Sequence, residues 1–241
     1  MAAPIVALIT AGSAGLGATT ARLFAKNGIR VVINYGTNTQ KAQSLVDELS
    51  QASSLEKVDG RVDFHAIKAD LTKREDINRL VDEAVSSMGK LDVVFSNGGW
   101  THIRNLQDLD DNVFEEDWDK CFNMNVKSHL WLMHAAKKHL DETEGAFITT
   151  ASLAGVKVSG SSLAYAVTKA AQIHLAKGLA IIAAPKIRVN TVSPGLLLTD
   201  WGLQFPKERI EAMKEATKLK RLATVDDVAE QVLCFARSVA A

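Results

Sequence analysis

Short apolar runs alternate with longer helical patterns along the chain, and this alternation limits the possible folds more than any other feature. Each run is rich in β-branched residues and apolar at successive positions, as in parallel strands that are buried on both faces. The runs cover residues 4–10, 29–34, 62–67, 91–96, 146–151 and 187–193. Because strand and helix alternate without a break in composition, the sequence predicts an α/β fold in which residues 1–241 form one doubly wound domain with a mostly parallel sheet.

The spacing of polar residues and glycines marks the expected helix boundaries. Thr72 followed by Glu75 has the spacing of a capping box at a helix start. Gly89 lies where a helix C-cap is expected, just before the fourth strand. The two longest helical patterns cover residues 112–140 and 162–184.

Composition argues against several classes of protein. The 28 basic residues balance 28 acidic residues, so the chain lacks the positive excess that nucleic-acid binding needs. The 2 cysteines, Cys121 and Cys234, are too few for a disulfide framework or a four-ligand zinc site. No stretch reaches about 18 apolar residues, and the apolar N-terminus lacks the basic region of a signal peptide. We therefore expect a cytoplasmic protein with no metal, membrane or nucleic-acid partner.

A glycine-rich segment, TAGSAGLG at residues 10–17, joins the first strand to the first helical pattern. Glycines there permit a tight turn and let backbone amides approach a pyrophosphate at the helix N-terminus. An ordinary glycine turn is the alternative, but the position between the first strand and the first helix favours a dinucleotide site. The expected contacts are Gly12, Ser13, Ala14, Gly15, Leu16 and Gly17.

The end of the second strand bears on the choice between NAD(H) and NADP(H). Many dinucleotide folds place an acidic residue about 20 residues further on, where it binds the ribose 2′-hydroxyl. Here no Asp or Glu occurs before Asp47, so no carboxylate repels a 2′-phosphate, and we expect NADP(H) rather than NAD(H). Donors to that phosphate are available at Tyr35, Thr37, Asn38 and Thr39, although these residues also suit a simple turn.

Two further segments follow predicted strands. Asp70 and Leu71 come after the third strand, where the Asp70 carboxylate is placed to accept a hydrogen bond from an adenine amino group. A residue that only starts the next helix is the alternative for Asp70. Asn97, Gly98 and Gly99 come after the fourth strand. Since open α/β sheets bind ligands at the carboxyl ends of their strands, we expect these three residues to let the cofactor pass closely.

Tyr165 and Lys169 lie four positions apart in the stretch AYAVTKA, and on a helix they share one face. A free phenol has a pKa near ~10, and an adjacent ammonium lowers it. Bringing it near neutrality takes about 3 pH units, or roughly 4 kcal/mol, after which the phenol can act as general acid or base. A surface tyrosine beside a solvated lysine is the simpler alternative.

Two more polar residues favour the catalytic interpretation. Ser152 follows the fifth strand, where its hydroxyl is able to meet a substrate carbonyl. Asn125 lies in the middle of a helical pattern, an unfavourable position for an asparagine unless it has a hydrated, functional role. A solvent-facing side chain is the alternative for Asn125.

Taken in order, these motifs resemble those of the short-chain dehydrogenase/reductase family, from about residue 4 to residue 238. TAGSAGLG is similar to the family's glycine loop, with Ala11 at a position where the family usually has glycine. SNGG at residues 96–99 resembles its Asn-Asn-Ala-Gly segment. SPGLLLT at residues 193–199 resembles its Pro-Gly segment, which covers the nicotinamide.

The resemblance implies a Rossmann-like fold and a role for each motif. Tyr165 would be the proton donor in ketone reduction, and Lys169 would lower its pKa and hold the nicotinamide ribose. Ser152 would orient the carbonyl oxygen, and Asn125 would hold a water that links Lys169 to solvent. Further cofactor contacts would come from Pro194, Gly195, Leu197 and Thr199.

Assembly is also implied by the resemblance. Family members usually continue into a seventh strand that helps to build tetramers, whereas six strands are visible in this sequence. We expect a homodimer or homotetramer, with a dimer contact through the two longest helical patterns. The small residues that would allow close helix approach there are Ala164, Ala170, Ala171 and Ala176.

By the same resemblance, residues 196–220 form a substrate lid. The expected pocket wall, which His102 also borders, is largely apolar and comprises Trp100, Ser152, Leu153, Leu196, Trp201 and Phe205. Packing of the lid onto the domain is the alternative, above all for Trp201. A bulky apolar or aromatic ketone fits such a wall better than a sugar.

Three functions are therefore compatible with the sequence. The first is an NADP(H)-dependent carbonyl reductase. The second is an NAD-linked alcohol dehydrogenase or a redox isomerase that uses the same four polar residues. The third is a dinucleotide-sensing protein without catalysis, which would have no need of a proton donor.

Overall fold

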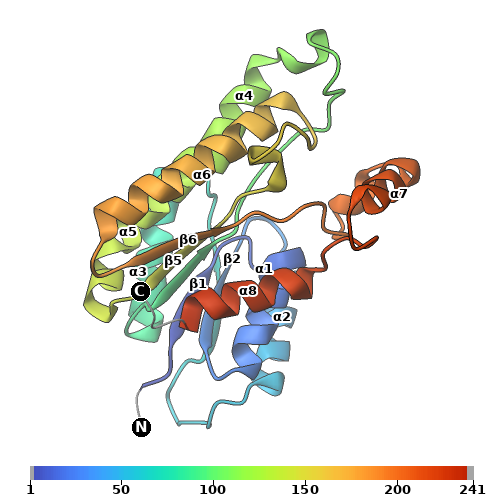
Figure 1. The fold of residues 1–241 in the computed structure, drawn as a ribbon. Helices are drawn as coiled ribbons and strands as arrows, with labels where there is room; N and C mark the ends of the chain where they lie inside the picture. The colour runs from blue at the N-terminus through green and yellow to red at the C-terminus, as the bar shows by residue number, and fades with distance from the viewer. Residues whose placement is uncertain (1–2, 238–241) are drawn as a thin grey trace.

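The structure, a computed structural model that describes residues 3–237, is built around a six-stranded parallel sheet (Figure 1). In space the strands follow the order β3-β2-β1-β4-β5-β6, so the chain changes direction across the sheet between β1 and β4. Doubly wound sheets bind ligands at this switch point. The predicted fold class is confirmed. The strands are β1 Val6–Ile9, β2 Arg30–Tyr35, β3 Phe64–Lys68, β4 Val93–Ser96, β5 Ala146–Thr150 and β6 Arg188–Val192.

Helices cover both faces of the sheet, and six of them bury an apolar side against it. One apolar cluster joins the sheet to α1, α2 and α8, and a second joins it to α3, α5 and α6. Figure 1 shows these two layers, with α8 lying beside α1 although the two are far apart in the sequence. The helices are α1 Gly15–Lys26, α2 Thr39–Ala52, α3 Arg74–Met88, α4 Glu115–Phe122, α5 Ser128–Thr143, α6 Leu163–Ala183, α7 Lys207–Ala216 and α8 Val225–Arg237.

The two edge strands differ from the sequence-based expectation. Residues of β1, β2 and β4 are buried throughout, as expected for strands covered on both faces. In β3, by contrast, His65 and Lys68 are exposed, and most of β6 is only half-buried. An edge strand has a neighbour on one side only, and its outer flank is open to solvent. The expectation of full burial is therefore wrong for β3 and β6.

The two ends of α3 test the helix boundaries that the sequence predicts. Gly89 ends α3 in the left-handed conformation, with φ of 81°, as predicted for a C-cap. The capping box predicted for Thr72 and Glu75 is wrong, because α3 starts only at Arg74. The Thr72 hydroxyl instead donates to the Asp70 carboxylate at 2.7 Å, which closes a turn before the helix.

The long helical pattern at residues 112–140 is not one regular α-helix. It comprises α4 and α5, joined by a single π-helical turn at Asn123–Lys127. A π turn adds one residue to the helix and rotates the side chains that follow, and such turns occur frequently at functional sites. Asn125 lies within this turn.

The segment between β6 and α8 carries α7, which stands away from the body of the domain in Figure 1. None of the residues of α7 is fully buried, so packing holds this helix weakly. Among residues 3–237, no helix combines the length and the apolar character needed to cross a bilayer.

Candidate active site

Tyr165 and Lys169 are positioned by the first turns of α6. The hydroxyl of Ser162 caps this helix by accepting a hydrogen bond from the backbone N–H of Tyr165 at 3.2 Å. Lys169 is only 3 % exposed, and its Nζ atom lies 5.6 Å from the centroid of the Tyr165 ring. The simpler alternative, a solvated lysine beside a surface tyrosine, is therefore wrong for Lys169.

Lys169 is fixed by two acceptors deep in the protein. Its Nζ atom donates to the carbonyl oxygen of Thr150, at the end of β5, at 2.7 Å and to Gln172 Oε1 at 2.9 Å. Burial lowers the pKa of Lys169 to about 7, while the Cys121 thiol acts in the opposite direction. The ammonium thus occupies a site where its charge is costly and where each acceptor matters.

Tyr165 is governed by burial rather than by its neighbouring cation. Burial raises the pKa of the phenol, and a hydrogen bond with the Ser152 hydroxyl lowers it. The sequence had predicted that Lys169 would be the dominant influence and would lower the phenol pKa. The difference has a physical cause: Lys169 is fully buried and Tyr165 is half-buried beside it, so loss of water disfavours the charged form of each group.

Ser152 follows β5 in an extended conformation that aims its side chain toward α6. Its Oγ atom accepts a hydrogen bond from the Ala154 N–H at 3.1 Å, which starts a short 3-10 turn. The hydroxyl proton remains free to be donated to the phenol or to a substrate carbonyl. The effect of this hydroxyl on the pKa of Tyr165 places the two side chains next to each other at the carboxyl end of the sheet.

Asn125 is fully buried, so the solvent-facing alternative is wrong. Its amide NH₂ group donates to the carbonyl oxygen of Trp100 at 2.9 Å and to Thr168 Oγ1 at 3.0 Å. Its Oδ1 atom accepts from the Trp100 N–H at 2.8 Å. Asn125 therefore ties the loop after β4 to α6, and the π turn supplies the rotation that aims it there.

The glycine loop is shaped as a phosphate cradle. Ala14 caps α1 without a side-chain acceptor, which leaves first-turn N–H groups available for an anion. A Cβ atom on Gly17 would lie 2.4 Å from the carbonyl oxygen of Ala11, so only glycine allows this approach of helix and loop. Ala11 itself has φ of 48°, a conformation that favours glycine, at the position where the sequence departs from the family pattern. Of the other predicted contacts, Gly12 and Ser13 lie in the turn, and Gly15 and Leu16 begin α1.

Polar side chains that the sequence analysis missed hold this loop in place. Asn34, buried in β2, accepts from the Ala11 N–H at 3.1 Å and donates to the Ala69 carbonyl at 3.1 Å. Thr10 Oγ1 accepts from the N–H groups of Asn97 and Gly98 at 2.9 and 3.2 Å. Their signal in the sequence is a polar residue at the end of an otherwise apolar strand.

The predicted 2′-phosphate segment forms the turn between β2 and α2. Tyr35 is buried, whereas Thr37 and Thr39 are exposed. Asn38 caps α2 by accepting from the Lys41 N–H at 2.8 Å, so it does contribute to a turn. The Lys41 ammonium lies 3.4 Å from the Asp200 carboxylate, which places a cation between this turn and the lid segment.

The residues after β3 and β4 lie against one another. Asp70 Oδ1 accepts from the Thr72 N–H at 2.9 Å, as a residue before a helix would, which agrees with the simpler alternative. The Leu71 side chain lies close to Gly98: a Cβ atom on Gly98 would be 2.5 Å from Leu71 Cδ1. A Cβ atom on Gly99 would lie 3.5 Å from Lys169 Nζ, so this loop borders the catalytic side chains.

The start of the lid segment lies beside the glycine loop. The carbonyl oxygen of Pro194 accepts from the Leu153 N–H at 2.9 Å, and Thr199 contacts Gly15. Gly195 is exposed, and Leu197 packs against the core under α1 and α8. The predicted cofactor contacts of this segment are therefore close to those of the loop.

The predicted apolar wall is only partly formed. Phe205 is 4 % exposed and packs edge-on against Trp201, with ring centroids 5.3 Å apart. For Phe205 the packing alternative is correct, because a buried ring does not line an open pocket. Trp201 is 38 % exposed, and Leu153 and Trp100 are also accessible in part, whereas Leu196 is half-buried.

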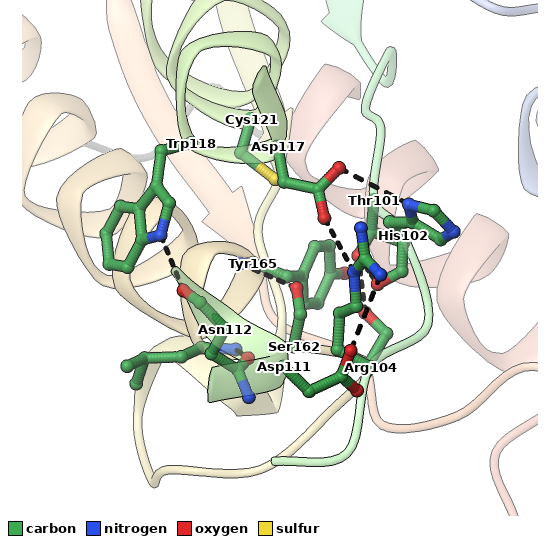
Figure 2. A network of polar contacts seen from close by, with 12 residues as sticks. Thr101, His102, Arg104, Asp111, Asn112, Asp117, Trp118, Cys121, Ser162 and Tyr165 are labelled. Atoms are coloured by element: carbon green, nitrogen blue, oxygen red, sulfur yellow. Dashed lines mark hydrogen bonds and ion pairs between the residues drawn. The ribbon is translucent and has the colours of Figure 1, made fainter. Parts of the chain in front are cut away.

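A polar network fixes the loop after Trp100 next to Tyr165 (Figure 2). The buried Asp117 carboxylate of α4 accepts from Arg104 Nε at 2.8 Å and lies 3.3 Å from His102 Nδ1. Asn112 joins the loop to the start of α6 by accepting from the Leu163 N–H at 2.8 Å. The loop is therefore clamped between α4 and α6. Of these residues, the sequence analysis had assigned a role only to His102, at the border of the expected pocket wall.

The small residues expected at a dimer contact divide into two groups. Ala164 and Ala176 are buried within the domain, so they cannot support close approach of a second copy, and that expectation is wrong for them. Ala170 is exposed and Ala171 is half-buried, so they remain available on the surface of α6.

Within residues 3–237, no group of three or more His, Cys, Asp or Glu side chains has the geometry of a metal site. Burial raises the pKa of the Cys121 thiol to about 11, which keeps it protonated beside the tyrosine and lysine.

Comparison with known proteins agrees with this geometry. A family model described as enoyl-(acyl carrier protein) reductase matches residues 10–241. A protein named for ketoacyl reductase 2 of the granaticin polyketide synthase of Streptomyces violaceoruber is 34 % identical over 97 % of this chain and 90 % of its own length. A hydroxynaphthalene reductase-like protein of Metarhizium guizhouense is 35 % identical over 81 % of this chain and 69 % of its own length.

Solved structures share the fold over nearly the whole chain. A short-chain dehydrogenase/reductase of Burkholderia xenovorans superposes with a TM-score of 0.87 at 25 % identity, covering 99 % of this chain and 93 % of its own. ElxO with NADP bound has a TM-score of 0.85 at 26 % identity, over 98 % and 93 % of the two chains. A 3-ketoacyl-(acyl-carrier-protein) reductase of Brucella melitensis in complex with NADH has a TM-score of 0.83 at 27 % identity, over 96 % and 90 %.

Proposed function

The chain belongs to the short-chain dehydrogenase/reductase family, and we propose that it is an NADP(H)-dependent carbonyl reductase in which Tyr165 is the general acid and base. One observation carries this proposal. The Tyr165 phenol is half-buried, a hydrogen bond with Ser152 lowers its pKa, and the Lys169 ammonium lies 5.6 Å from its ring centroid. A proton donor, an orienting hydroxyl and a cation are thus assembled where doubly wound sheets bind their ligands.

Each residue has a distinct task in ketone reduction. When bound, the nicotinamide supplies the hydride that adds to the carbonyl carbon. Ser152 donates a hydrogen bond to the carbonyl oxygen and orients it, and Tyr165 gives its proton to the same oxygen. The Lys169 ammonium stabilises the phenolate that remains. Asn125 fixes the loop after β4, so that the pocket keeps its shape and, with a water, links Lys169 to solvent.

The residues present suit a dinucleotide. The uncapped start of α1 offers N–H groups to the pyrophosphate, and the close approach at Gly17 keeps that surface free of side chains. Lys169 Nζ has N–H capacity beyond its two protein acceptors for the ribose hydroxyls. The other predicted contacts line the same edge of the sheet.

The preference for NADP(H) is supported by the turn after β2. No carboxylate follows Tyr35 there, and the exposed Thr37 and the Asn38 NH₂ group remain able to donate to a 2′-phosphate. Lys41, whose backbone N–H caps onto Asn38, adds a positive charge near the turn that it shares with the Asp200 carboxylate 3.4 Å away. One solved relative holds NADP, and another holds NADH, so NAD(H) is the cofactor of the alternative proposal.

We propose a fused aromatic or otherwise bulky apolar ketone as substrate. Trp100, Leu153 and Trp201 each expose part of an apolar side chain, Leu153 directly after Ser152 and Trp100 in the loop that Asn125 ties to α6. Among the relatives, one is named for a hydroxynaphthalene and another for a polyketide synthase, which agrees in chemical class. A homo-oligomer remains part of the proposal, with Ala170 on the exposed side of α6.

Nicotinamide absorbance tests the proposal directly. The protein is assayed with NADPH and with NADH against a panel of aliphatic, aromatic and fused-ring ketones. Reduction of the aromatic ketones with a higher kcat/KM for NADPH supports the proposal. Turnover with NADH alone would favour the NAD-linked alternative. Tight NADPH binding without turnover of any ketone would favour a non-catalytic sensor.

A further inference from the structure

A chain of buried hydrogen bonds runs from Lys169 to the end of β4, and the proposed reaction does not use it. Lys169 Nζ donates to Gln172 Oε1 at 2.9 Å, and Gln172 Nε2 lies 3.0 Å from His129 Nε2. His129 Nδ1 lies 2.5 Å from Ser96 Oγ. None of these four side chains exposes more than 3 % of its surface. Three elements, β4, α5 and α6, are therefore linked through polar groups inside an apolar layer.

The hydrogen bonds of this chain allow one orientation of the Gln172 amide. Burial and the charge of Lys169 lower the pKa of His129 to about 3, so its imidazole is neutral, with one nitrogen donating and the other accepting. The Gln172 NH₂ group has acceptors for both hydrogens, at His129 Nε2 and at the Thr150 carbonyl oxygen, 3.1 Å away. His129 Nδ1 then carries the proton and donates to Ser96. The reversed amide would point N–H groups at the ammonium.

This orientation leaves the amide oxygen as an acceptor for Lys169. An ammonium has three N–H donors, and Thr150 O and Gln172 Oε1 take two of them. Both acceptors are fixed by their surroundings: Thr150 O belongs to the backbone of β5, and the Gln172 amide is hydrogen-bonded to His129. Three titratable groups surround this site: Cys121 from α4 raises the pKa of Lys169, while His129 from α5 and Tyr165 from α6 lie next to it.

We propose that Gln172, oriented by His129, is a positioning residue that holds the Lys169 ammonium beside the Tyr165 ring. The inference rests on the proposed function, since it assigns a role in the same reaction. Gln172 acts by position alone, because an amide does not relay protons at neutral pH. Removal of its oxygen destabilises the charged form of a lysine that is already costly to bury, and the phenolate loses part of its counter-charge.

The spacing of these residues agrees with a shared task. Gln172 lies three positions after Lys169 on α6, and His129 lies four positions after Asn125, across the π turn. Gln172 is therefore on the same face of α6 as Lys169, the residue it supports. A purely structural role, in which the polar chain fixes how α5 packs on α6, is the competing explanation. The two differ in what they predict for the charge of Lys169.

The experiment measures that charge directly. The whole, cofactor-free protein is labelled with ¹³C at lysine Cε, and the Lys169 resonance, assigned by its loss in Lys169→Met, is titrated with pH. In Gln172→Met, which keeps the side-chain length, the pKa of Lys169 falls by about one pH unit or more. Gln172→Glu, which keeps an oxygen and adds a negative charge, raises it. Leu132→Met, a conservative change of a buried residue on α5, leaves it unchanged.

Activity provides a second readout. With NADPH and a ketone substrate, Gln172→Met lowers kcat by about tenfold or more, while the Kd for NADPH stays the same. A Lys169 pKa that is the same in wild type and in Gln172→Met would overturn the inference. If Gln172→Met does not fold, His129→Leu decides in its place: loss of amide orientation lowers the Lys169 pKa, and an unchanged value overturns the inference. A shifted Lys169 pKa in a protein that reduces no ketone refutes the proposed function and leaves this inference standing.

Discussion

Lys169 Nζ lies 2.7 Å from the carbonyl oxygen of Thr150, which ties the catalytic helix α6 to the carboxyl end of β5. This contact buries an ammonium next to a phenol in a part of the core that offers it only neutral acceptors. Burial destabilises the charged form of Lys169 and lowers its pKa to about 7. A buried cation of this kind has a use in catalysis that an apolar residue would not have.

The first prediction concerns how stability depends on pH. Burial lowers the pKa of Lys169 from 10.5 to about 7, so the unfolded state binds more protons than the native state between these values. Stability therefore rises with pH through that window. Between pH 7 and pH 9, the cofactor-free wild type gains about 2 kcal/mol of unfolding free energy relative to Lys169→Met.

Denaturant unfolding at the two pH values measures this gain. Lys177→Met provides the matched control, because Lys177 is exposed on the same helix. Its pH dependence is expected to equal that of the wild type. A Lys169→Met protein with an unaltered pH dependence would contradict the burial of an ammonium at this site.

A second prediction tests the glycine loop. Gly17→Ala introduces a Cβ atom 2.4 Å from the Ala11 carbonyl oxygen, so α1 must move away from the loop that binds the pyrophosphate. We expect NADPH affinity to fall by about 100-fold, since a displacement near 1 Å misaligns several N–H groups. Fluorescence titration with NADPH gives the Kd. In Gly178→Ala, a control on α6 where a Cβ atom has nothing within 4 Å, binding stays normal.

A third prediction tests the choice of cofactor. Gly36 follows β2, is exposed and has nothing within 4 Å of a Cβ atom, so an added side chain fits. Gly36→Asp places a carboxylate where a 2′-phosphate would lie, and like charges repel. We expect NADPH to bind at least about tenfold more weakly, while NADH binding changes little; Gly36→Asn controls for size. An equal loss of affinity for NADPH and NADH would show that this turn does not distinguish a 2′-phosphate from a 2′-hydroxyl.

A fourth prediction tests the network that clamps the loop after Trp100. Asp117→Asn removes the charge that pairs with Arg104 and lies 3.3 Å from His102, which frees the loop without touching the catalytic hydroxyls (Figure 2). We expect a lower Tm and a KM for ketone raised by about tenfold, with an unchanged Kd for NADPH. Asp111→Asn, which removes a longer and more exposed contact to Arg104, is expected to have a smaller effect. An unchanged KM in Asp117→Asn would separate this loop from substrate binding.

The fold was predictable because apolar runs and glycines report on strands and turns directly. All six runs became strands, and Gly89 ends its helix as expected. The edge strands β3 and β6 were not foreseen, because a run of apolar residues does not reveal how many neighbours a strand has. The π turn at Asn125 was also hidden, since its sequence continues the helical pattern on both sides.

The site was predictable in its residues and less so in its physics. Tyr165, Lys169, Ser152 and Asn125 are found near one another, but the pKa of the phenol is set by burial rather than by the ammonium. Spacing along a helix gives proximity and does not give the depth of burial. Phe205 shows the same limit, because an aromatic residue in a lid segment suits a pocket wall and a packed core equally well. The role of Gln172 could not be predicted from the sequence, because its partner His129 comes from a different helix, α5.

The central claim is that Tyr165 gives and takes the proton in a hydride-transfer reaction. Its most direct test is NADPH oxidation by Tyr165→Phe with the best ketone substrate, together with the Kd of that variant for NADPH. The account predicts that kcat falls by about 100- to 10,000-fold, since this is the contribution of a general acid, while NADPH binds as in the wild type. A variant that retains near-normal kcat would contradict the account and remove the phenol from the mechanism.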